Sequence, residues 1–366
     1  MAGISLLTCI REMLIWLWRL LEVVADVFFQ RCFMRGLPPL TGVGGPVEGC
    51  NCIVTGPTSG IGGETAKELV RRRANVYLAC RSMERGTKLK AELMTVARQA
   101  GNPNPTIEVL QLDVSSLASV RAFAQAWQQR GRPLHVLVNN AGIFSMGAAR
   151  SETVDGVEAH LGTNYLGPFL LTMLLLPALR AAAQQAANGH PPLARIVHVS
   201  SSLHELGIIQ RGDMQLIRPR RIFSVIAYGN SKLAQILFAA EMRRRLPKDS
   251  GIVVCAVHPG EVLTDVVRSL PPAIRTLYRW IMRHILLTPT EGARSSIYCA
   301  TSPDLAGLAD LAATAGDPAK CYINSNCRIL TPSWRALDPV MATWLWRWSA
   351  EAVKLPAEYD LPEPKR

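Results

Sequence analysis

The sequence lacks the cysteine and histidine patterns that hold metal ions or disulfide frameworks. Its nine cysteines are odd in number and scattered, none forms C-x-x-C, and no histidine-rich segment accompanies them. Metal ligation and a disulfide framework are therefore not expected. A reducing, cytosol-facing compartment fits this cysteine usage best.

The sequence also lacks the residue pattern of a nucleic-acid-binding groove, so no nucleic-acid partner is expected. The net charge is +12, yet no run of basic residues alternates with aromatic residues. Several basic residues lie instead on apolar helices, which favours a membrane surface; the alternative is an arginine-rich solvated surface. With 366 residues, 49% of them hydrophobic, the chain can bury one large α/β domain or two smaller ones.

The apolar N-terminus has no clean run of about 18 uncharged residues and no small-residue cleavage site. A simple membrane span and a removable signal are therefore disfavoured. Five of the charged residues in segment 4–34 lie within about a third of a helical turn: Arg11, Glu12, Arg19, Glu22 and Asp26. We expect a helix in the membrane interface with this polar stripe facing water. A spanning signal anchor and a helix packed on the protein itself remain alternatives.

The most informative segment is a glycine-rich loop between an apolar run and a helix. Gly56, Gly60 and Gly62 follow the run Cys52–Thr55 in the spacing G-x-x-x-G-x-G. Glycines let a pyrophosphate approach the amides of a helix N-terminus, where the helix dipole also favours an anion. Taken alone, the triplet is weak evidence, and a flexible turn before a surface helix is the alternative.

Apolar runs and helical segments then alternate along the chain. The runs are Cys52–Thr55, Asn75–Cys80, Ile107–Leu112, Leu134–Val138, Arg195–Val199 and Ile252–Val257, and the helices lie near 60–73, 84–100, 116–129, 152–182 and 226–246. This alternation predicts an α/β doubly wound parallel sheet, the Rossmann fold, with ligands at the carboxyl ends of the strands.

No acidic residue ends the second apolar run, where one would hold the ribose hydroxyls of NAD(H). Arg81 stands there instead, and its guanidinium suits a 2′-phosphate, which favours NADP(H) as cofactor. An exposed loop arginine is the alternative. Asp113, which closes the third run, could accept a hydrogen bond from adenine or cap the following helix.

Tyr228 and Lys232 are four residues apart, hence on one face of a helix. A neighbouring ammonium, together with an oxidised nicotinamide, would lower the pKa of the phenol and let it exchange a proton with an alcohol or carbonyl. Upstream, Ser200, Ser201 and Ser202 end an apolar run, where a serine could bond a substrate oxygen or cap a helix. Asn164, inside a predicted helix, could be structural or serve a water chain.

In combination, these motifs resemble the short-chain dehydrogenase/reductases, and within them the retinol-dehydrogenase-like branch. The resemblance covers about residues 50–330 and rests on TGPTSGIG at 55–62, NNAG at 139–142, VSSS at 199–202, YGNSK at 228–232 and HPG at 258–260. Segments such as TAKELVRR, VYLACRSMERG and GPFLLTMLLLPAL narrow it to that branch.

The resemblance implies roles for individual residues. Tyr228 would be the acid/base, Lys232 would lower its pKa and bind the nicotinamide ribose, Ser201 would polarise the substrate oxygen, and Asn164 would support a proton relay. The choice among the three serines stays open. The cofactor-binding set would be Gly56, Ser59, Gly60, Ile61, Gly62, Arg81, Asp113, Asn140, Tyr228, Lys232, Pro259, Gly260 and Thr264.

Two further helices are predicted towards the C-terminus. Pro271–Leu287 spaces Arg275, Arg279 and Arg283 by four residues beside an apolar face, which suits a lipid-facing substrate lid or a solvated stripe. A second helix carries Trp344, Trp346 and Trp348, for which core packing is the default expectation. We divide the chain into a membrane-associating helix and linker (1–46), an NADP-binding domain (47–335) with the lid near 261–290, and a C-terminal helix and tail (336–366).

We expect an NADP(H)-dependent oxidoreductase that interconverts a lipophilic, retinoid- or polyisoprenoid-like alcohol and its aldehyde or ketone. It would be associated with the endoplasmic reticulum or lipid droplets and face the cytosol. The alternatives are a steroid or fatty-aldehyde reductase, and a membrane-associated NADP(H)-binding scaffold or sensor with little turnover. Oligomeric state is left open, a homodimer included.

Overall fold

The centre of the computed structural model is a seven-stranded sheet. The structure describes residues 6–34, 37–145, 147–187, 194–217, 223–263, 282, 284–305 and 321–363. The strands run in the order β3-β2-β1-β4-β5-β6-β7, and every neighbouring pair is parallel. Their bounds are β1 Asn51–Thr55, β2 Asn75–Cys80, β3 Ile107–Gln111, β4 Val136–Asn139, β5 Ala194–Val199, β6 Ile252–Val257 and β7 Tyr322–Ile323. The predicted doubly wound fold is confirmed.

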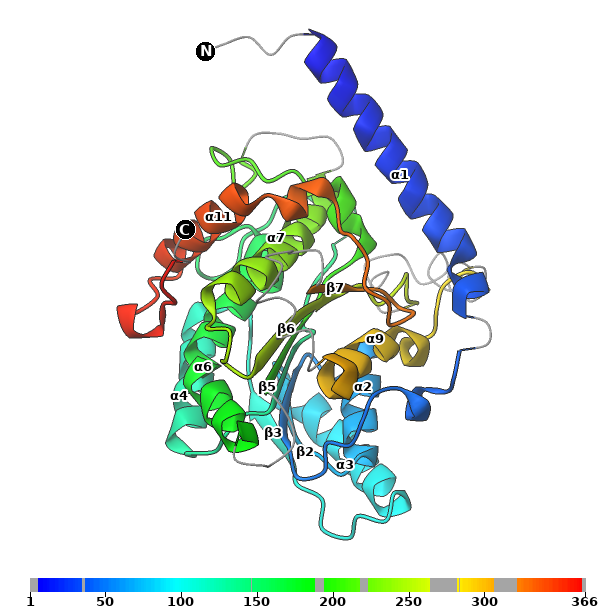
Figure 1. Ribbon diagram of the computed structural model, residues 1–366, viewed down its shortest axis with the longest axis vertical. Helices are drawn as coiled ribbons and strands as arrows, with labels where there is room; N and C mark the ends of the chain where they lie inside the picture. Colours follow the sequence, from blue (N-terminus) through cyan, green and yellow to red (C-terminus); the bar gives the residue numbers. More distant parts are fainter. Residues whose placement is uncertain are drawn as a thin grey trace.

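Helices cover both faces of this sheet (Figure 1). The longer ones are α2 Gly60–Arg71, α3 Met83–Gln99, α4 Leu117–Gln129, α6 Gly167–Ala187, α7 Phe223–Arg245, α9 Pro289–Thr301 and α11 Pro339–Ala352. The short helical turns are η1 Leu40–Gly42, α5 Ala159–Leu161, η2 Gly162–Leu166, η3 Ser202–Leu206, η5 Pro303–Leu305, η7 Trp334–Leu337 and η8 Ala357–Tyr359. Helices α2, α3 and α9 lie on one face, and α4, α6 and α7 on the other.

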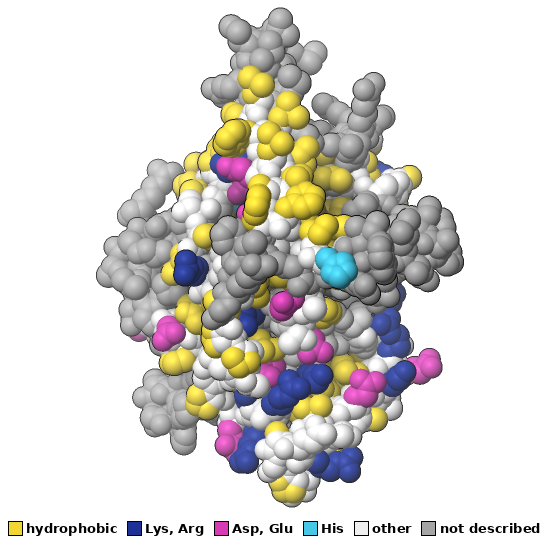
Figure 2. Space-filling model, turned by 90° about the vertical axis from the view of Figure 1, so that its right-hand side faces the viewer, with side chains coloured by type: hydrophobic (Ala, Val, Ile, Leu, Met, Phe, Trp, Pro, Cys, Tyr) yellow, Lys and Arg dark blue, Asp and Glu magenta, His cyan; other side chains and the backbone are white. Residues whose placement is uncertain are grey.

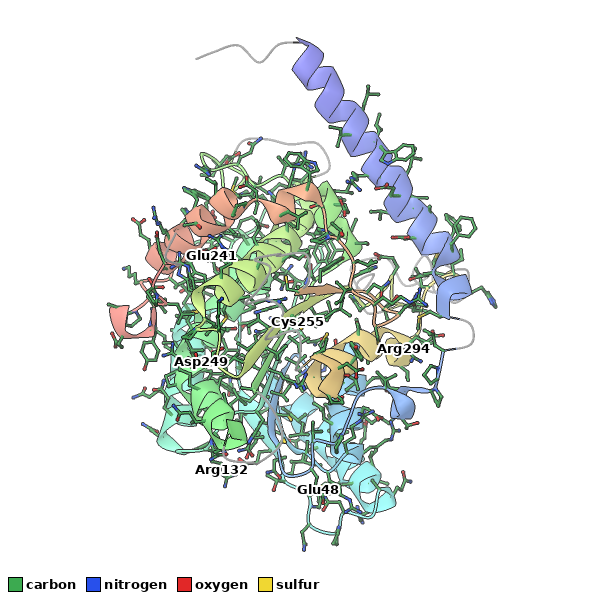
Figure 3. All side chains as sticks on the ribbon, viewed as in Figure 1. Glu48, Arg132, Glu241, Asp249, Cys255 and Arg294 are labelled. Carbon is green, nitrogen blue, oxygen red and sulfur yellow. The ribbon has the colours of Figure 1, made fainter. Side chains whose placement is uncertain are left out.

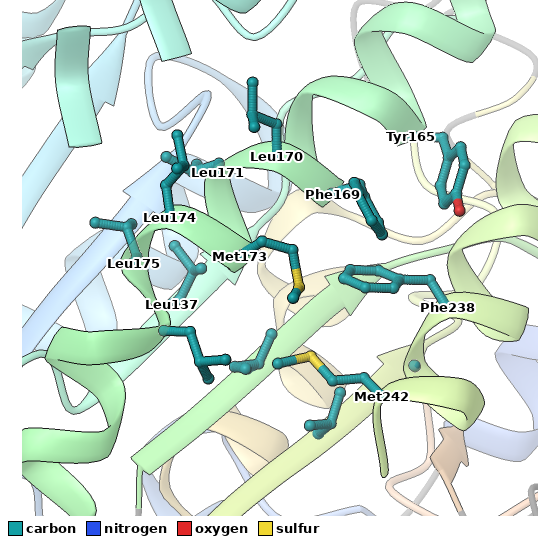
Figure 4. Close-up of a cluster of buried hydrophobic side chains, with 14 of the residues drawn as sticks. Leu137, Tyr165, Phe169, Leu170, Leu171, Met173, Leu174, Leu175, Phe238 and Met242 are labelled. Carbon is teal, nitrogen blue, oxygen red and sulfur yellow. The ribbon is translucent and has the colours of Figure 1, made fainter. Parts of the chain in front are cut away.

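The two faces have separate hydrophobic cores because successive strand residues point to opposite sides. Val54 packs with α2, α3 and α9, whereas its neighbour Ile53 packs with α4, α6 and α7. On the second face, the rings of Phe169 and Phe238 lie 4.8 Å apart, centre to centre, near Met173 and Met242 (Figure 4). Each core buries apolar surface against the same sheet, which fixes the ends of the strands where loops gather.

The predicted helix near 152–182 was wrong at its start. Glu152 pairs with Glu158 in an isolated antiparallel bridge, and Gly156 adopts a φ of +72° that ends any helical path. The helix starts at Ala159, where the Glu158 carboxylate accepts hydrogen bonds from the amides of His160 and Leu161. Local capping therefore sets this start later than the apolar pattern indicates.

The last strand was missed by the sequence analysis. β7 has only two residues, and these pair with Ala256 and Val257 of β6. A two-residue strand leaves no periodic signal, and its place is set by pairing with β6 and by a bridge to Ile329. Most of the predicted lid helix Pro271–Leu287, namely residues 271–281 and 283, lies outside the described residues.

The helix with three tryptophans, α11, packs on the protein. This is the core packing that was expected by default. Trp346 is 2% exposed and lies edge-on to Phe169, with ring centres 5.5 Å apart. Glu241 of α7, labelled in Figure 3, is fully buried and pairs with Arg245 at 2.7 Å. Glu241 also accepts a hydrogen bond from Thr343 of α11 at 3.2 Å, so α11 is fixed to α7.

The N-terminal helix α1 (Leu6–Met34) extends beyond the body of the molecule (Figure 1). Of the predicted polar stripe, Glu22 and Asp26 are exposed, whereas Arg19 is part-buried against the sheet domain. Arg19 contacts Glu205 at 3.5 Å, and Gln30 is 7% exposed against the loop after β6. Arg19 and Gln30 therefore face the domain, where each finds a partner.

Apolar side chains occupy the outer side of α1 instead. Figure 2 shows them gathered along the projecting helix. The exposed set is Leu14, Leu17, Trp18, Leu21, Val24, Phe28 and Phe29, with exposures between 42% and 64%. Within the described residues, one helix is long and apolar enough to cross a membrane, Ala159–Gln185, but 78% of its apolar window is buried in the protein. That helix is part of the core.

Candidate functional site

The glycine-rich loop closes against the end of β4. Gly56 and Gly60 adopt φ angles of +62° and +58°, which other residues rarely adopt. At Gly62, an added Cβ would lie 2.3 Å from the side-chain nitrogen of Asn140. Only glycine therefore lets the loop and the first turn of α2 approach this strand so closely.

Asn140 holds the loop in place from the neighbouring strand. Its side-chain amide donates to the carbonyl oxygens of Thr55 at 2.9 Å and of Gly56 at 3.2 Å. The Thr55 hydroxyl in turn accepts from the amides of Asn140 and Ala141, both at 3.0 Å. Asn140 also lines the cavity at the carboxyl ends of the strands, in agreement with its predicted place in the cofactor site.

A cavity of about 340 Å³ runs along the carboxyl ends of the strands. Its lining comes from the loops after six of them, as a doubly wound sheet requires. Among the predicted cofactor residues it includes Gly56, Ser59, Gly60, Ile61, Arg81, Asp113, Asn140, Tyr228, Lys232 and Pro259. The elongated set, with a helix N-terminus at the glycine loop, fits a dinucleotide whose pyrophosphate lies over α2.

The end of the cavity near β2 is basic. Arg81 is exposed directly after the strand, and Arg85 lies one turn into α3. Arg85 also donates to the carbonyl oxygen of Thr58 at 3.1 Å, which joins α3 to the glycine loop. The sequence analysis missed Arg85, although a second arginine four residues after Arg81 is a signal that it could have used.

Asp113 lines the cavity and does not cap the next helix. The N-cap of α4 is Ser116, whose hydroxyl accepts from the amide of Ser119. One carboxylate oxygen of Asp113 accepts from the amide of Ser115 at 3.0 Å and from its hydroxyl at 2.6 Å. Of the two roles left open for Asp113, the helix cap is excluded.

Tyr228 and Lys232 lie together on α7 at the other end of the cavity. The ammonium of Lys232 is 5.4 Å from the centre of the Tyr228 ring and donates to the carbonyl oxygen of Val199 at 2.7 Å. The Tyr228 ring stacks on Phe144, with centres 4.4 Å apart. The helical spacing thus brings the phenol and the amine to one wall, as the sequence predicted.

The three serines after β5 differ in what their hydroxyls contact. Ser201 hydrogen-bonds with the side chain of Tyr228. Ser200 donates to the backbone carbonyl of Lys232 at 3.0 Å, and Ser202 donates to the Glu261 carboxylate. Ser201 lies beside the cavity and is not among its lining residues. Of the three hydroxyls, only that of Ser201 is bonded to the phenol.

Asn164 lies in η2, a single π-helical turn in which the amide of Gly167 bonds back to the carbonyl oxygen of Gly162. Its side chain exchanges hydrogen bonds with the backbone of Ile143, at 2.7 and 3.0 Å. Its backbone carbonyl accepts from Gln235 at 2.6 Å, and Gln235 accepts from Lys232 at 3.4 Å. Gln235, which the sequence analysis missed, therefore connects Lys232 to Asn164.

The protein residues alone do not lower the pKa of Tyr228, contrary to the expectation from its Lys232 neighbour. Burial raises that pKa, the charge of Glu261 raises it further, and the hydrogen bond with Ser201 opposes both. Burial also lowers the pKa of Lys232 to about 7, so its positive charge is only partial near neutral pH. The positive charge expected from an oxidised nicotinamide is not part of this balance.

The loop after β6 carries the remaining predicted residues. Pro259 lines the cavity, and Gly260 adopts a φ of +81°. A Cβ at Gly260 would lie 2.5 Å from Leu287 and 3.0 Å from the side-chain oxygen of Gln30. Thr264 lies outside the described residues.

Known proteins resemble this chain over most of its length. The family model described as short chain dehydrogenase matches residues 51–213. The dehydrogenase/reductase SDR family member FEY of Arabidopsis thaliana is 36% identical, covering 94% of this chain and 88% of that protein. Human retinol dehydrogenase 11 is 38% identical over 84% of this chain and 86% of its own. Mouse polyprenol dehydrogenase is 39% identical, covering 72% of this chain and 75% of that protein.

Solved structures share the fold. An actinorhodin polyketide ketoreductase with NADPH matches with a TM-score of 0.53 and 25% identity, covering 71% of this chain and 92% of the other. The NADPH-bound carbonyl reductase from chicken fatty liver has a TM-score of 0.54 and 24% identity, covering 81% and 99%. Sequence relatives and sheet topology agree: this chain belongs to the short-chain dehydrogenase/reductase family of nicotinamide-dependent oxidoreductases, and within it to the retinol-dehydrogenase-like branch.

Proposed function

We propose that this protein is a membrane-associated, NADP(H)-dependent oxidoreductase that interconverts a lipophilic alcohol and its aldehyde or ketone. The observation that carries the proposal is the contact set around Tyr228. Its phenol is hydrogen-bonded to Ser201, and Lys232 lies against its ring at one end of a cavity whose other end is basic.

The chain's own residues account for the proton transfer. In carbonyl reduction, the phenol of Tyr228 gives its proton to the substrate oxygen, while Ser201 donates a hydrogen bond to that oxygen. The resulting phenolate is stabilised by Lys232 and reprotonated from it. Lys232 donates to the side-chain oxygen of Gln235, and Gln235 donates to the backbone carbonyl of Asn164. These two oxygens are the hydrogen-bond acceptors on the side of Lys232 from which a proton would arrive. The nicotinamide supplies or accepts the hydride, so the reverse sequence oxidises the alcohol.

Two arginines support NADP(H) over NAD(H). Arg81 and Arg85 line the cavity just after β2, on either side of Ser82. In this fold the adenosine ribose lies at the end of the second strand. Guanidinium groups bind phosphate through paired hydrogen bonds. The two related structures named above were solved with NADPH, which is consistent with this choice.

The outer side of α1 supports a lipophilic substrate and a membrane location. Large apolar side chains such as Trp18, Leu21 and Phe28 are 59–64% exposed there. Exposed apolar stripes of this kind bind the interfacial region of a bilayer. Relatives are named for retinol and polyprenol, both lipophilic alcohols. We propose a retinoid- or polyisoprenoid-like substrate taken up at endoplasmic-reticulum or lipid-droplet surfaces, with the catalytic domain facing the cytosol.

Comparing Tyr228→Phe with wild type tests the proposal. With NADPH and a panel of retinal, polyprenal, steroid and fatty-aldehyde substrates, the variant should lose at least about 100-fold in kcat. Its NADPH affinity, followed by the fluorescence of the reduced nicotinamide, should change less than about threefold. Tyr359→Phe, which removes a phenol hydroxyl bonded to Gln128 away from the cavity, is the matched control and should keep most of the rate. Equal rates for wild type and Tyr228→Phe would exclude the enzymatic role and favour a cofactor-binding scaffold.

A further inference from the structure

Glu261 places a carboxylate beside the catalytic side chains, a feature that no sequence motif singled out. It follows Gly260 in the loop after β6 and is half-buried. Its carboxylate accepts a hydrogen bond from the hydroxyl of Ser202, the residue after Ser201. The backbone amide of Ser202 also donates to His258 at 3.0 Å. The turn that carries Ser201 is therefore held from the loop after β6 at two points.

The backbone of Glu261 is held by the N-terminal helix. Gln30 of α1 accepts from the amide of Glu261 at 2.8 Å and donates to its carbonyl at 3.1 Å. The same Gln30 amide lies 3.3 Å from the carbonyl oxygen of Ile285. One buried side chain thus bonds two points of the chain, one on each side of residues 264–281. A buried amide that satisfies three backbone groups fixes their spacing closely.

We propose that Glu261 is a positioning residue of this catalytic centre: anchored to α1 through Gln30, it holds the Ser201–Ser202 turn against Tyr228. The inference rests on the proposed function and deepens it, because it makes α1 a support of the active site as well as a membrane-binding element. It also assigns a role to the buried Gln30, the one polar side chain of α1 that bridges two loop segments among the described residues.

The charge of Glu261 has a second effect on the same phenol. When ionised, Glu261 raises the pKa of Tyr228, which favours the protonated form that donates during carbonyl reduction. Burial raises the pKa of Glu261 itself, and the hydrogen bond from Ser202 opposes that rise. The other groups that face this site do not cancel that charge. Asp26 of α1 is acidic, the pKa of His258 is lowered to about 4 by burial, and Tyr322 of β7 has a raised pKa. Alcohol oxidation, which needs the phenolate, should therefore set in only at higher pH.

Glu261→Gln separates the charge from the shape. The amide keeps an acceptor for Ser202 and the backbone held by Gln30, but removes the negative charge. The alkaline limb of the pH–rate profile for alcohol oxidation should move down by about one pH unit. Ser202→Ala keeps the carboxyl group of Glu261 but removes the hydrogen bond that holds the turn and that lowers the pKa of Glu261, and it should lower kcat severalfold. Glu22→Gln on the exposed side of α1 is the control and should match wild type.

Positioning is read independently of turnover by hydrogen exchange of the amides in residues 201–207. Gln30→Leu and Ser202→Ala should each raise exchange there by at least about threefold, while Glu22→Gln leaves it unchanged. Unchanged exchange in Gln30→Leu would overturn the positioning role, and an unmoved alkaline limb in Glu261→Gln would overturn the charge effect. If wild type has no NADPH-dependent turnover, the proposed function fails, and the exchange experiment still decides the positioning.

Discussion

The ammonium of Lys232 sits between the ring of Tyr228, at 5.4 Å, and the backbone carbonyl of Val199, which it contacts at 2.7 Å. The end of β5 thereby helps to fix the amine that serves the phenol of α7. Lys232 is 4% exposed, so its charge is expensive to keep without such partners. The same burial that prepares the proton path makes Lys232 a pH-dependent element of stability.

Lys232→Met should change both turnover and the pH dependence of stability. Burial lowers the pKa of Lys232 to about 7 from an ordinary 10.5, so between these values the unfolded chain binds a proton that the folded chain does not. Stability of wild type therefore rises with pH across this window and is lost as pH falls through about 7. Thermal unfolding of the variant should lack this rise, and kcat should fall at least about 100-fold. The same slope in both proteins would contradict the prediction.

Ser201→Ala should cost far more than Ser200→Ala. Ser201 bonds the phenol, whereas the Ser200 hydroxyl donates to a backbone carbonyl. We expect a loss of about 100-fold in kcat for Ser201→Ala and about tenfold less for Ser200→Ala, measured with NADPH and one lipophilic aldehyde. The reverse order would shift the catalytic role to Ser200.

Arg81→Ala and Arg85→Ala should weaken the binding of NADPH more than that of NADH. Each loses a charge-assisted contact to the 2′-phosphate, so the Kd for NADPH should rise about tenfold per substitution. Titration by nicotinamide fluorescence with both cofactors measures this selectivity. Arg98→Ala, at the far end of α3, is the matched control. If the affinities for NADPH and NADH fall in parallel, the two arginines do not select the phosphate.

Leu21→Glu with Phe28→Glu should release the protein from membranes. Both side chains belong to the outer apolar side of α1, and charges there oppose insertion between lipid headgroups. Flotation with vesicles rich in anionic lipid should show at least about a tenfold loss of bound protein. Val154→Glu, at a site outside α1 that is 83% exposed, should bind as wild type does. These substitutions test membrane binding alone, whereas deletion of residues 1–35 would also remove Gln30 and its bonds to Glu261.

Much of the sheet could be predicted because its strands are buried on both sides. Such strands read as unbroken apolar runs, and the predicted Asn75–Cys80 and Ile252–Val257 agree with β2 and β6 to the residue. The nucleotide end of the site followed from the same logic, since residues after apolar runs must meet at one edge of the sheet. Tyr228 and Lys232 followed from helical spacing.

The remaining contacts depend on residues far apart in the sequence. Gln30 and Glu261 are 231 positions apart, and neither carries a motif. Gln235 is one polar residue within an apolar helix and gains its role only when Asn164 lies opposite. The contact of Arg19 in α1 with Glu205 likewise joins distant residues, and periodicity within α1 cannot reveal it.

The π-helical turn at 162–166 has a consequence for both halves of the molecule. It holds one residue more than a regular helical turn, so everything after it on α6 is rotated by about 100° relative to an uninterrupted helix. That rotation aims Phe169 at Phe238 and Trp346, while the loosened turn offers the carbonyl of Asn164 to Gln235. A single-residue deletion there would straighten the helix and misdirect core and proton path together. The same extra residue therefore determines both the packing of Phe169 in the core and the position of the Asn164 carbonyl in the site.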